Sequence, residues 1–310
     1  MEGESFTVAV LGDASLGRAL AKAATTSDIE LYHKARDGRV YTFLYPKSYP
    51  EKPQVLFQCL SVADAVVFAV REVNAFTGEQ VVAVDSSGVT QGIVLGEESL
   101  LEPFGKAVKG TTIAGFKASG GDPEEIYAAL ASFNKAPREG TGRSVIDHYF
   151  DVKGVGTVAL GFVSRGELRV HEKLKLLPAE KFVEVRSIQM QDEDAKTARA
   201  GDRFGIALKG AGVEDLERGS VLSADHVEKP LKELVLSFRK NPYYKGELAA
   251  GKKVHVCIGM QSVSGTVSGA SGSSASIALE KGCAAEKSEK AFVLDLNSKG
   301  LRVVGVGVVS

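Results

Sequence analysis

The sequence predicts an α/β domain followed by two β-barrels. Apolar strand-like runs alternate with helical stretches through roughly the first third of the chain, which is typical of a doubly wound layer. The stretch 135–143 contains Pro, Gly and charged residues and is typical of a linker. Beyond it, short β-rich runs recur about every ten residues between Gly or charged turns, the pattern of small barrels. The predicted domains are therefore residues 1–137, 144–224 and 228–310.

The α/β domain is expected to begin with a buried strand over 5–11, a glycine-bounded turn over 12–17 and a helix over 18–24. The near-continuous apolar run at 65–70 is typical of a parallel strand covered on both faces. Asp122 precedes a Pro and two acids, the pattern of a capped helix start. The remaining elements expected here are strands over 40–44 and 92–95, a loop over 46–50 and a helix over 78–88.

The two barrels are indicated by separate sets of short apolar runs. The Gly/Ser-rich stretch 262–276 fits either a pair of short strands with a flexible turn or a loop. The runs assigned to strands are 156–163, 172–177 and 204–208 in the first barrel, and 234–238, 253–258, 291–294 and 301–309 in the second.

Composition excludes several classes of protein. The 310 residues are 44% hydrophobic and 25% charged, which is ordinary for a globular chain and unlike a disordered or collagen-like one. No apolar run of about 18 residues occurs, so no membrane partner is expected. The acidic start, Met1 to Ser5, lacks the basic and apolar parts of a secretory signal, so we expect a cytosolic protein. Three dispersed cysteines without CxxC spacing predict neither a zinc site nor a disulfide framework.

Charge is unevenly distributed along the chain. Residues 1–137 carry 12 basic and 17 acidic side chains, whereas residues 228–310 carry 12 basic and 7 acidic ones. The net charge of the last part is therefore +5, against −1 for the whole chain. Either a polyanion meets the C-terminal part, or small domains differ by this much by chance.

The turn after the first strand resembles a phosphate-binding loop. The pattern GxxxxGK[ST] needs inward backbone N–H groups, a Lys for the phosphates and a hydroxyl for Mg²⁺. Gly12 and Gly17 have the required spacing, but Arg18 stands in place of the Lys and Ala19 in place of the Ser or Thr. Asp13 adds a negative charge inside the loop. These five residues are the candidate vestigial nucleotide-binding residues; a purely structural strand–helix turn is the alternative.

Other parts of a GTPase are also absent from the sequence. The expected strand 40–44 is followed by Tyr45 to Ser48, without an acid to orient Mg²⁺. After the strand 92–95 the segment 96–100 contains Glu97 and Glu98 but lacks the [NT]KxD pattern that reads guanine. We therefore predict a degenerate P-loop GTPase-like domain, with no catalytic residue, no metal ligand and no cofactor; weak binding of GTP and Mg²⁺ is the alternative.

The motifs of the first barrel carry a family resemblance. The segment 146–166, which contains Gly-Val-Gly-Thr-Val at 154–158, resembles the start of domain 2 of elongation factor Tu and its relatives. Three later blocks follow in the same order as in that family: 183–188, 200–208 and 215–222. The resemblance implies a GTPase-like domain, two β-barrels, and binding of aminoacyl-tRNA or the ribosome.

Three short segments outside the later blocks are similar to one branch of that family. Thr26-Ser-Asp-Ile29, Ser48-Tyr-Pro50 and Ile146-Asp-His148 resemble the archaeal selenocysteine-specific elongation factors and their truncated pyrrolysine-associated paralogues. The resemblance places the first two segments in the switch region. It also places Tyr49 where the family has its catalytic His, and a Tyr cannot orient the attacking water in the same way.

The leading hypothesis from the sequence is a monomeric, RNA-binding translation factor that has lost GTP binding and hydrolysis. The partners expected are aminoacyl-tRNA or another RNA, and the ribosome. The alternatives are a working GTPase with an altered pocket and a regulatory protein-interaction module. The candidate RNA-binding residues are His148, Arg165 and Arg186 in the first barrel, for the aminoacyl end, and Arg239, Lys240, Tyr243, Tyr244 and Lys245 in the second, for phosphates and stacking.

Overall fold

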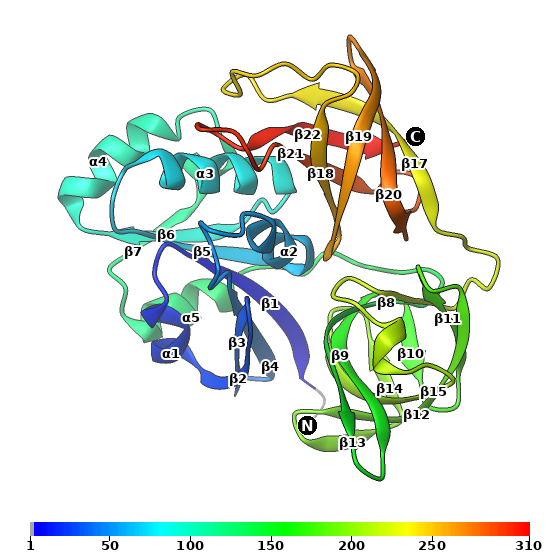
Figure 1. Ribbon diagram of the computed structural model, residues 1–310. Helices are drawn as coiled ribbons and strands as arrows, with labels where there is room; N and C mark the ends of the chain where they lie inside the picture. The colour runs from blue at the N-terminus through cyan, green and yellow to red at the C-terminus, as the bar shows by residue number, and fades with distance from the viewer. Residues whose placement is uncertain (1–2) are drawn as a thin grey trace. The chain divides into compact units, whose positions relative to one another are not determined.

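The computed structural model describes residues 3–310 and confirms the predicted fold class, a mixed α/β sheet domain followed by two antiparallel β-barrels (Figure 1). The chain divides into two compact units. Unit 1 consists of residues 1–136, 242–245 and 296–303; unit 2 consists of residues 137–241, 246–295 and 304–310. Met1 and Glu2, part of the acidic start considered above, lie outside the described residues.

Unit 1 is built on a seven-stranded sheet in the order β2-β3-β4-β1-β5-β6-β7. The pairs from β4 through β7 are parallel, as predicted for an α/β layer, while β2, β3 and β4 form an antiparallel meander at one edge. The strands are β1 Glu4–Leu11, β2 Lys22–Thr26, β3 Glu30–Arg36, β4 Arg39–Tyr45, β5 Ala65–Val70, β6 Gly92–Gly96 and β7 Lys117–Ser119.

Helices complete unit 1 and follow the local sequence rules. The Asp122 side chain caps α5 by accepting from the N–H groups of Glu124 and Glu125, as its sequence predicted. Asn74 caps α3 in the same way, and Gly88 ends that helix in the left-handed region. The helices are α1 Ser15–Leu20, α2 Gln54–Val62, α3 Ala75–Ser87, α4 Glu98–Ala107 and α5 Pro123–Ala131, with a 3-10 turn at Thr112–Gly115.

The prediction of a helix over 18–24 is wrong. Helix α1 ends at Leu20, and Ala21 is already extended. The next residues form β2, which pairs antiparallel with β3, Lys22 lying opposite His33. Two alanines favour a helix locally, but hydrogen bonding to the edge of the sheet overrides that weak preference.

Unit 2 begins with the first barrel. Its six main strands close into a ring in the order β11-β16-β8-β9-β15-β12, with β12 pairing back to β11. Side chains from every one of these strands fill the barrel interior. The strands are β8 Arg143–Val152, β9 Gly156–Arg165, β10 Glu167–Arg169, β11 Lys173–Leu177, β12 Lys181–Met190, β13 Glu193–Ala195, β14 Thr197–Arg199, β15 Arg203–Lys209 and β16 Val221–Ser223, with a 3-10 turn at Val213–Asp215.

The second barrel is closed in the order β17-β20-β19-β18-β21-β22. The Gly/Ser-rich stretch forms the long antiparallel pair β19–β20, so the strand alternative holds and the loop alternative is wrong. Residues 261–267 of β19 alternate between buried and half-buried, the period-2 pattern of a barrel wall. The strands are β17 Leu231–Lys240, β18 Lys253–Ile258, β19 Gln261–Ser271, β20 Ser274–Cys283, β21 Lys290–Leu294 and β22 Val303–Val309. Within residues 3–310, no helix has the length and apolarity needed to cross a bilayer.

Candidate functional site

Packing alone accounts for both glycines of the loop after β1. Gly12 has φ +82°, and a Cβ there would lie 1.9 Å from the carbonyl oxygen of Ala69 on the neighbouring strand β5. A Cβ on Gly17 would lie 2.4 Å from the Tyr32 ring on β3. Each position therefore requires glycine whether or not a phosphate is bound.

The Asp13 carboxylate accepts hydrogen bonds from donors of the same loop. It accepts the Ser15 backbone N–H and the Ser15 hydroxyl, both at 2.7 Å, so a backbone donor at the start of α1 is already satisfied. Arg71 donates to the other carboxylate oxygen, from Nε at 2.8 Å and also from Nη2. Burial acts to raise the pKa of Asp13, but the hydrogen bonds from Ser15 and Arg71 outweigh burial and hold that pKa below its ordinary value. The loop thus contains a carboxylate that already accepts one of its backbone N–H groups.

Arg18 faces an internal partner as well. Its guanidinium lies 3.8 Å from the buried Glu30 carboxylate, which also accepts from Lys47 at 3.0 Å and from the Tyr32 hydroxyl at 2.6 Å. Ala19 is exposed and has no polar group to offer a metal. The residues present therefore do not fit Mg²⁺ and a nucleoside triphosphate: the lysine and the hydroxyl are missing, and a carboxylate lies where phosphate oxygens would need N–H donors.

Tyr45, the last residue of β4, and Tyr49 in the loop after it are structural. The Tyr49 hydroxyl donates to the carbonyl oxygen of Phe76 at 2.9 Å, and its ring packs edge-on against the Phe76 ring. Burial raises the pKa values of Tyr45 and Tyr49, so both stay protonated near neutral pH and neither is a general base. Glu97 and Glu98 lie at the start of α4.

Two of the predicted RNA-binding residues of the first barrel lie around the β8–β9 hairpin. His148 is half-buried on β8, with its ring 5.8 Å from the exposed Phe150 ring. Arg186 is exposed on β12 and donates to the carbonyl oxygen of Val155, in the turn of the hairpin, at 3.4 Å. Arg186 also lies at a register irregularity between β12 and β15, where the strand pairing is interrupted.

Arg165, the third residue predicted in the first barrel, is engaged in an ion pair within unit 2. Its guanidinium forms a two-pronged ion pair with Glu286, at 2.8 and 3.0 Å. The hydrogen bond from Arg165 holds the pKa of Glu286 below its ordinary value. Arg165 is thus a structural residue of unit 2 in this structure, and its fork is not free for an aminoacyl group.

A polar cluster that the sequence analysis does not predict surrounds Asp147, the residue before His148 in the chain. Asp147 is the extra residue of a bulge in β8 and is buried. Its carboxylate accepts from Nη1 of Arg203 on β15 at 2.7 Å, and Nε of Arg218 donates to its backbone carbonyl at 3.2 Å. The Arg203 guanidinium lies 5.0 Å from the Phe162 ring centroid.

One donor of this cluster is left over. Among the residues that the structure describes, Nη2 of Arg203 is buried and has no hydrogen-bond partner. A buried donor without an acceptor is costly, so a ligand acceptor that reached it after a local rearrangement would remove that cost. The only trace of the cluster in the sequence is that Asp147 and Arg203 both fall inside family-like blocks.

The aromatic and basic residues predicted at the end of β17 differ in accessibility. Arg239 and Lys240 are exposed at the end of β17, and Lys245 is exposed after it. Tyr243 is 69% exposed, but Tyr244 is only 3% exposed, so the Tyr244 ring packs inside the protein and offers no face for stacking. Several other basic residues counted in the +5 region are already ion-paired, namely Lys252 with Asp295, Lys253 with Glu280, Lys281 with Glu217, and Arg302 with Glu79.

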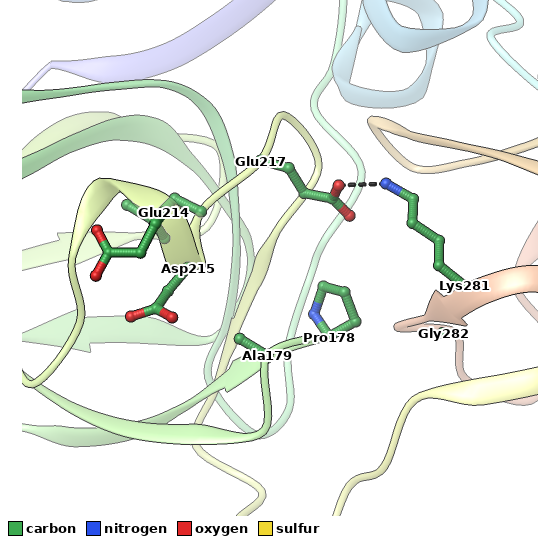
Figure 2. A pocket seen from close by; sticks show the side chains of 8 residues that line it. Pro178, Ala179, Glu214, Asp215, Glu217, Lys281 and Gly282 are labelled. Atoms are coloured by element: carbon green, nitrogen blue, oxygen red, sulfur yellow. Dashed lines mark hydrogen bonds and ion pairs between the residues drawn. The ribbon is translucent and has the colours of Figure 1, made fainter.

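A shallow cavity of about 400 Å³ lies in unit 2 (Figure 2). It is lined by Pro178 and Ala179, by residues 214–217, and by Lys281 and Gly282. Figure 2 shows the Glu217–Lys281 ion pair at one side and two further carboxylates, Glu214 and Asp215, at the other. This acidic lining disfavours RNA phosphates, so the cavity is not part of the candidate interface.

Comparison with known proteins agrees with this architecture. Residues 156–223 match the protein-family model of elongation factor Tu domain 2. An uncharacterised protein of Methanocaldococcus jannaschii is 32% identical over 307 residues, which is 98% of this chain and 99% of that protein. The selenocysteine-specific elongation factor of the same organism is 35% identical over 147 residues, which is 47% of this chain but only 30% of that factor.

Solved structures show the same fold. Translation elongation factor SelB of Methanococcus maripaludis, in complex with the GTP analogue GPPNHP, superposes with a TM-score of 0.87 at 20% identity. The superposition covers 100% of this chain and 80% of that one. A bacterial selenocysteine-specific elongation factor gives a TM-score of 0.83 at 19% identity, over 99% of this chain and 58% of that one. The chain belongs to the family of elongation factor Tu-like translational GTPases and is related to its selenocysteine-specific members.

Proposed function

We propose that this protein is a translation factor that binds aminoacyl-tRNA without using GTP. The observation that carries the proposal is Nη2 of Arg203, which is buried and has no hydrogen-bond partner among residues 3–310, in the cluster around Asp147. In this proposal residues 1–137, 144–224 and 228–310 act as three domains of a cytosolic monomer, and the ribosome is a further partner.

The first barrel would hold the aminoacyl end of the tRNA. An aminoacyl ester offers carbonyl and hydroxyl oxygens, which suit an arginine N–H whose other edge is already fixed by Asp147. The exposed Phe150 ring beside His148 supplies a face for the terminal base. Arg186 adds a positive charge near the same hairpin.

The exposed cations at the end of β17 would contact the tRNA backbone. Arg239, Lys240 and Lys245 supply sequence-independent attraction to phosphates, and Tyr243 adds an exposed aromatic ring. The affinity of such contacts falls with salt because each neutralised phosphate releases counterions.

The α/β domain would act without nucleotide because its loop is satisfied internally. The Asp13 carboxylate already binds the Ser15 N–H and Arg71, and Arg18 is paired with Glu30. We expect Mg²⁺ and GTP to bind with a Kd of about 0.1 mM or weaker, equivalent to about −5.5 kcal/mol. A low-micromolar Kd by calorimetry would instead support the alternative of a GTPase with an altered pocket.

The aminoacyl site is tested by filter binding of charged and uncharged forms of the same tRNA, at two salt concentrations. Arg203→Ala and His148→Ala should weaken binding of the charged tRNA about tenfold and of the uncharged tRNA much less. Arg169→Ala, which removes an exposed arginine of the same barrel that pairs with Glu167, is the matched control and should change neither. Equal effects of Arg203→Ala on charged and uncharged tRNA would remove the aminoacyl site. No binding to any tRNA would favour a protein-interaction module.

A further inference from the structure

Arg302 forms a buried ion pair in unit 1. It lies in the segment 296–303, just before β22, and this segment belongs to unit 1. Its backbone N–H and Nε donate to one carboxylate oxygen of Glu79 on α3, at 3.0 and 3.1 Å, and its Nη2 donates to the other at 2.5 Å. The Glu79 and Arg302 side chains are only 3% and 13% exposed. Each ion has lost most of its hydration, and the attraction between the two charges compensates for that loss.

The same guanidinium also holds the loop after β4. Its Nη1 donates to the backbone carbonyl of Pro50 at 2.6 Å. The guanidinium carbon lies 5.7 Å from the Tyr49 ring centroid and 6.0 Å from that of Phe76. Two consecutive loop residues are thus tied, through one arginine, to α3.

The loop also has other ties within unit 1: Lys47 pairs with Glu30 at 3.0 Å, and the Tyr49 hydroxyl donates to the carbonyl oxygen of Phe76 at 2.9 Å. Asp28 accepts from the Ser48 hydroxyl at 2.9 Å and from Lys52 Nζ at 3.0 Å, and its carbonyl accepts the Ser48 N–H. The remaining backbone bonds are local turns, in which Tyr49 N–H donates to Pro46 and Lys52 N–H donates to Ser48. Local turns of this kind open easily when the contacts around them are lost.

We infer that Arg302 is a positioning residue that fixes the loop 46–53 in one conformation, whatever nucleotide is offered. Moving the loop would remove the acceptor of Nη1 and the Tyr49 ring beside the guanidinium, and would expose the buried ion pair to rearrangement. The inference rests on unit 1 alone and does not depend on RNA binding by the barrels.

Hydrogen–deuterium exchange on the full chain tests this role. The readout is the exchange of the amides of Ser48, Tyr49 and Lys52, with β5 amides reporting on the core of unit 1. Arg302→Ala should speed exchange of the loop amides at least tenfold while β5 is unchanged. Arg302→Lys, which keeps the charge but loses the fork, should have a smaller effect. Arg36→Ala removes another two-pronged pair of unit 1, with Glu124, and should leave the loop unchanged.

Addition of Mg²⁺ and GTP to the wild-type protein should leave the loop amides within twofold of their rates without nucleotide. Two results would overturn the inference. In one, the loop amides of Arg302→Ala exchange within twofold of wild type. In the other, β5 amides speed up by the same factor as the loop, because Arg302 would then hold unit 1 as a whole. Glu79→Gln provides a second variant of similar shape, which should also speed loop exchange.

Discussion

Replacing Arg143 by alanine removes a buried cation that lies among one buried and two half-buried carboxylates in unit 2. Nη1 of Arg143 pairs with Glu228 and lies 3.8 Å from Glu286, and its Nη2 lies 3.7 Å from Glu289. Nη2 also donates to the carbonyl of Ala284 at 3.1 Å. The Arg143 and Glu228 side chains are 6% and 8% exposed, so water cannot replace the lost cation without rearrangement.

The expected loss of stability follows from this burial. Removing one member of a buried ion pair typically costs about 3–5 kcal/mol, because the remaining charge is left unpaired. Since about 1.4 kcal/mol is a factor of ten, the slowest-exchanging amides of β9 should exchange at least about a hundredfold faster in Arg143→Ala. The control is Lys106→Ala, which removes an exposed helix-surface pair with Glu102 and should change stability by under about 1 kcal/mol. If β9 exchange in Arg143→Ala rises less than about fivefold, the ion pairs of Arg143 do not stabilise the barrels by the expected amount.

Three further predictions concern the loop after β1 and the buried thiols. Gly12→Ala should lower the free energy of unfolding, measured by urea denaturation, by about 3 kcal/mol. Gly38 also has a positive φ, +77°, but no atom lies near the position of its Cβ, so Gly38→Ala should cost only about 1–2 kcal/mol. Equal losses would refute the close approach of Gly12 to β5. Because the pKa of Asp13 is lowered, its stabilising contribution should be present above the ordinary value of 3.8 and disappear as pH falls through the lower folded-state value. Acid titration of Asp13→Asn should lack that component, and identical titrations would contradict it. Burial raises the pKa of Cys257 and Cys283 to about 12, so neither thiol should react with a disulfide reagent at pH 8 until the protein unfolds, and rapid labelling of the folded chain would show that they are accessible.

The sequence allowed the fold to be predicted where pattern and burial coincide. The apolar run that became β5 reads as a parallel strand because both of its faces are covered. The stretch that became β2 was misread as a helix because its alanines favour one locally, while its pairing with β3 is a tertiary effect.

The site was less predictable because its contacts join residues far apart in the chain. The pairing of Arg165 with Glu286 cannot be predicted from local pattern, because the two residues lie 121 positions apart. The pairing of Arg203 with Asp147 depends on a bulge in β8 and on the closure of the barrel, neither of which leaves a local pattern. The loop after β1, in contrast, was read correctly as lacking the lysine and hydroxyl of a phosphate loop, although the internal role of Asp13 became visible only in the structure.

The nucleotide dependence of aminoacyl-tRNA binding tests the proposal most directly. The dissociation constant of one charged tRNA should be measured by filter binding with Mg²⁺ and GTP, with Mg²⁺ and GDP, and in EDTA without nucleotide. All comparisons should be made at matched ionic strength, because phosphate contacts depend on salt. The structure of the loop, with Asp13 bound to Ser15 and Arg71, predicts the same Kd within about twofold with GTP and with GDP, and binding that persists in EDTA. Binding that appears only with GTP, tenfold or more tighter than with GDP, would contradict it.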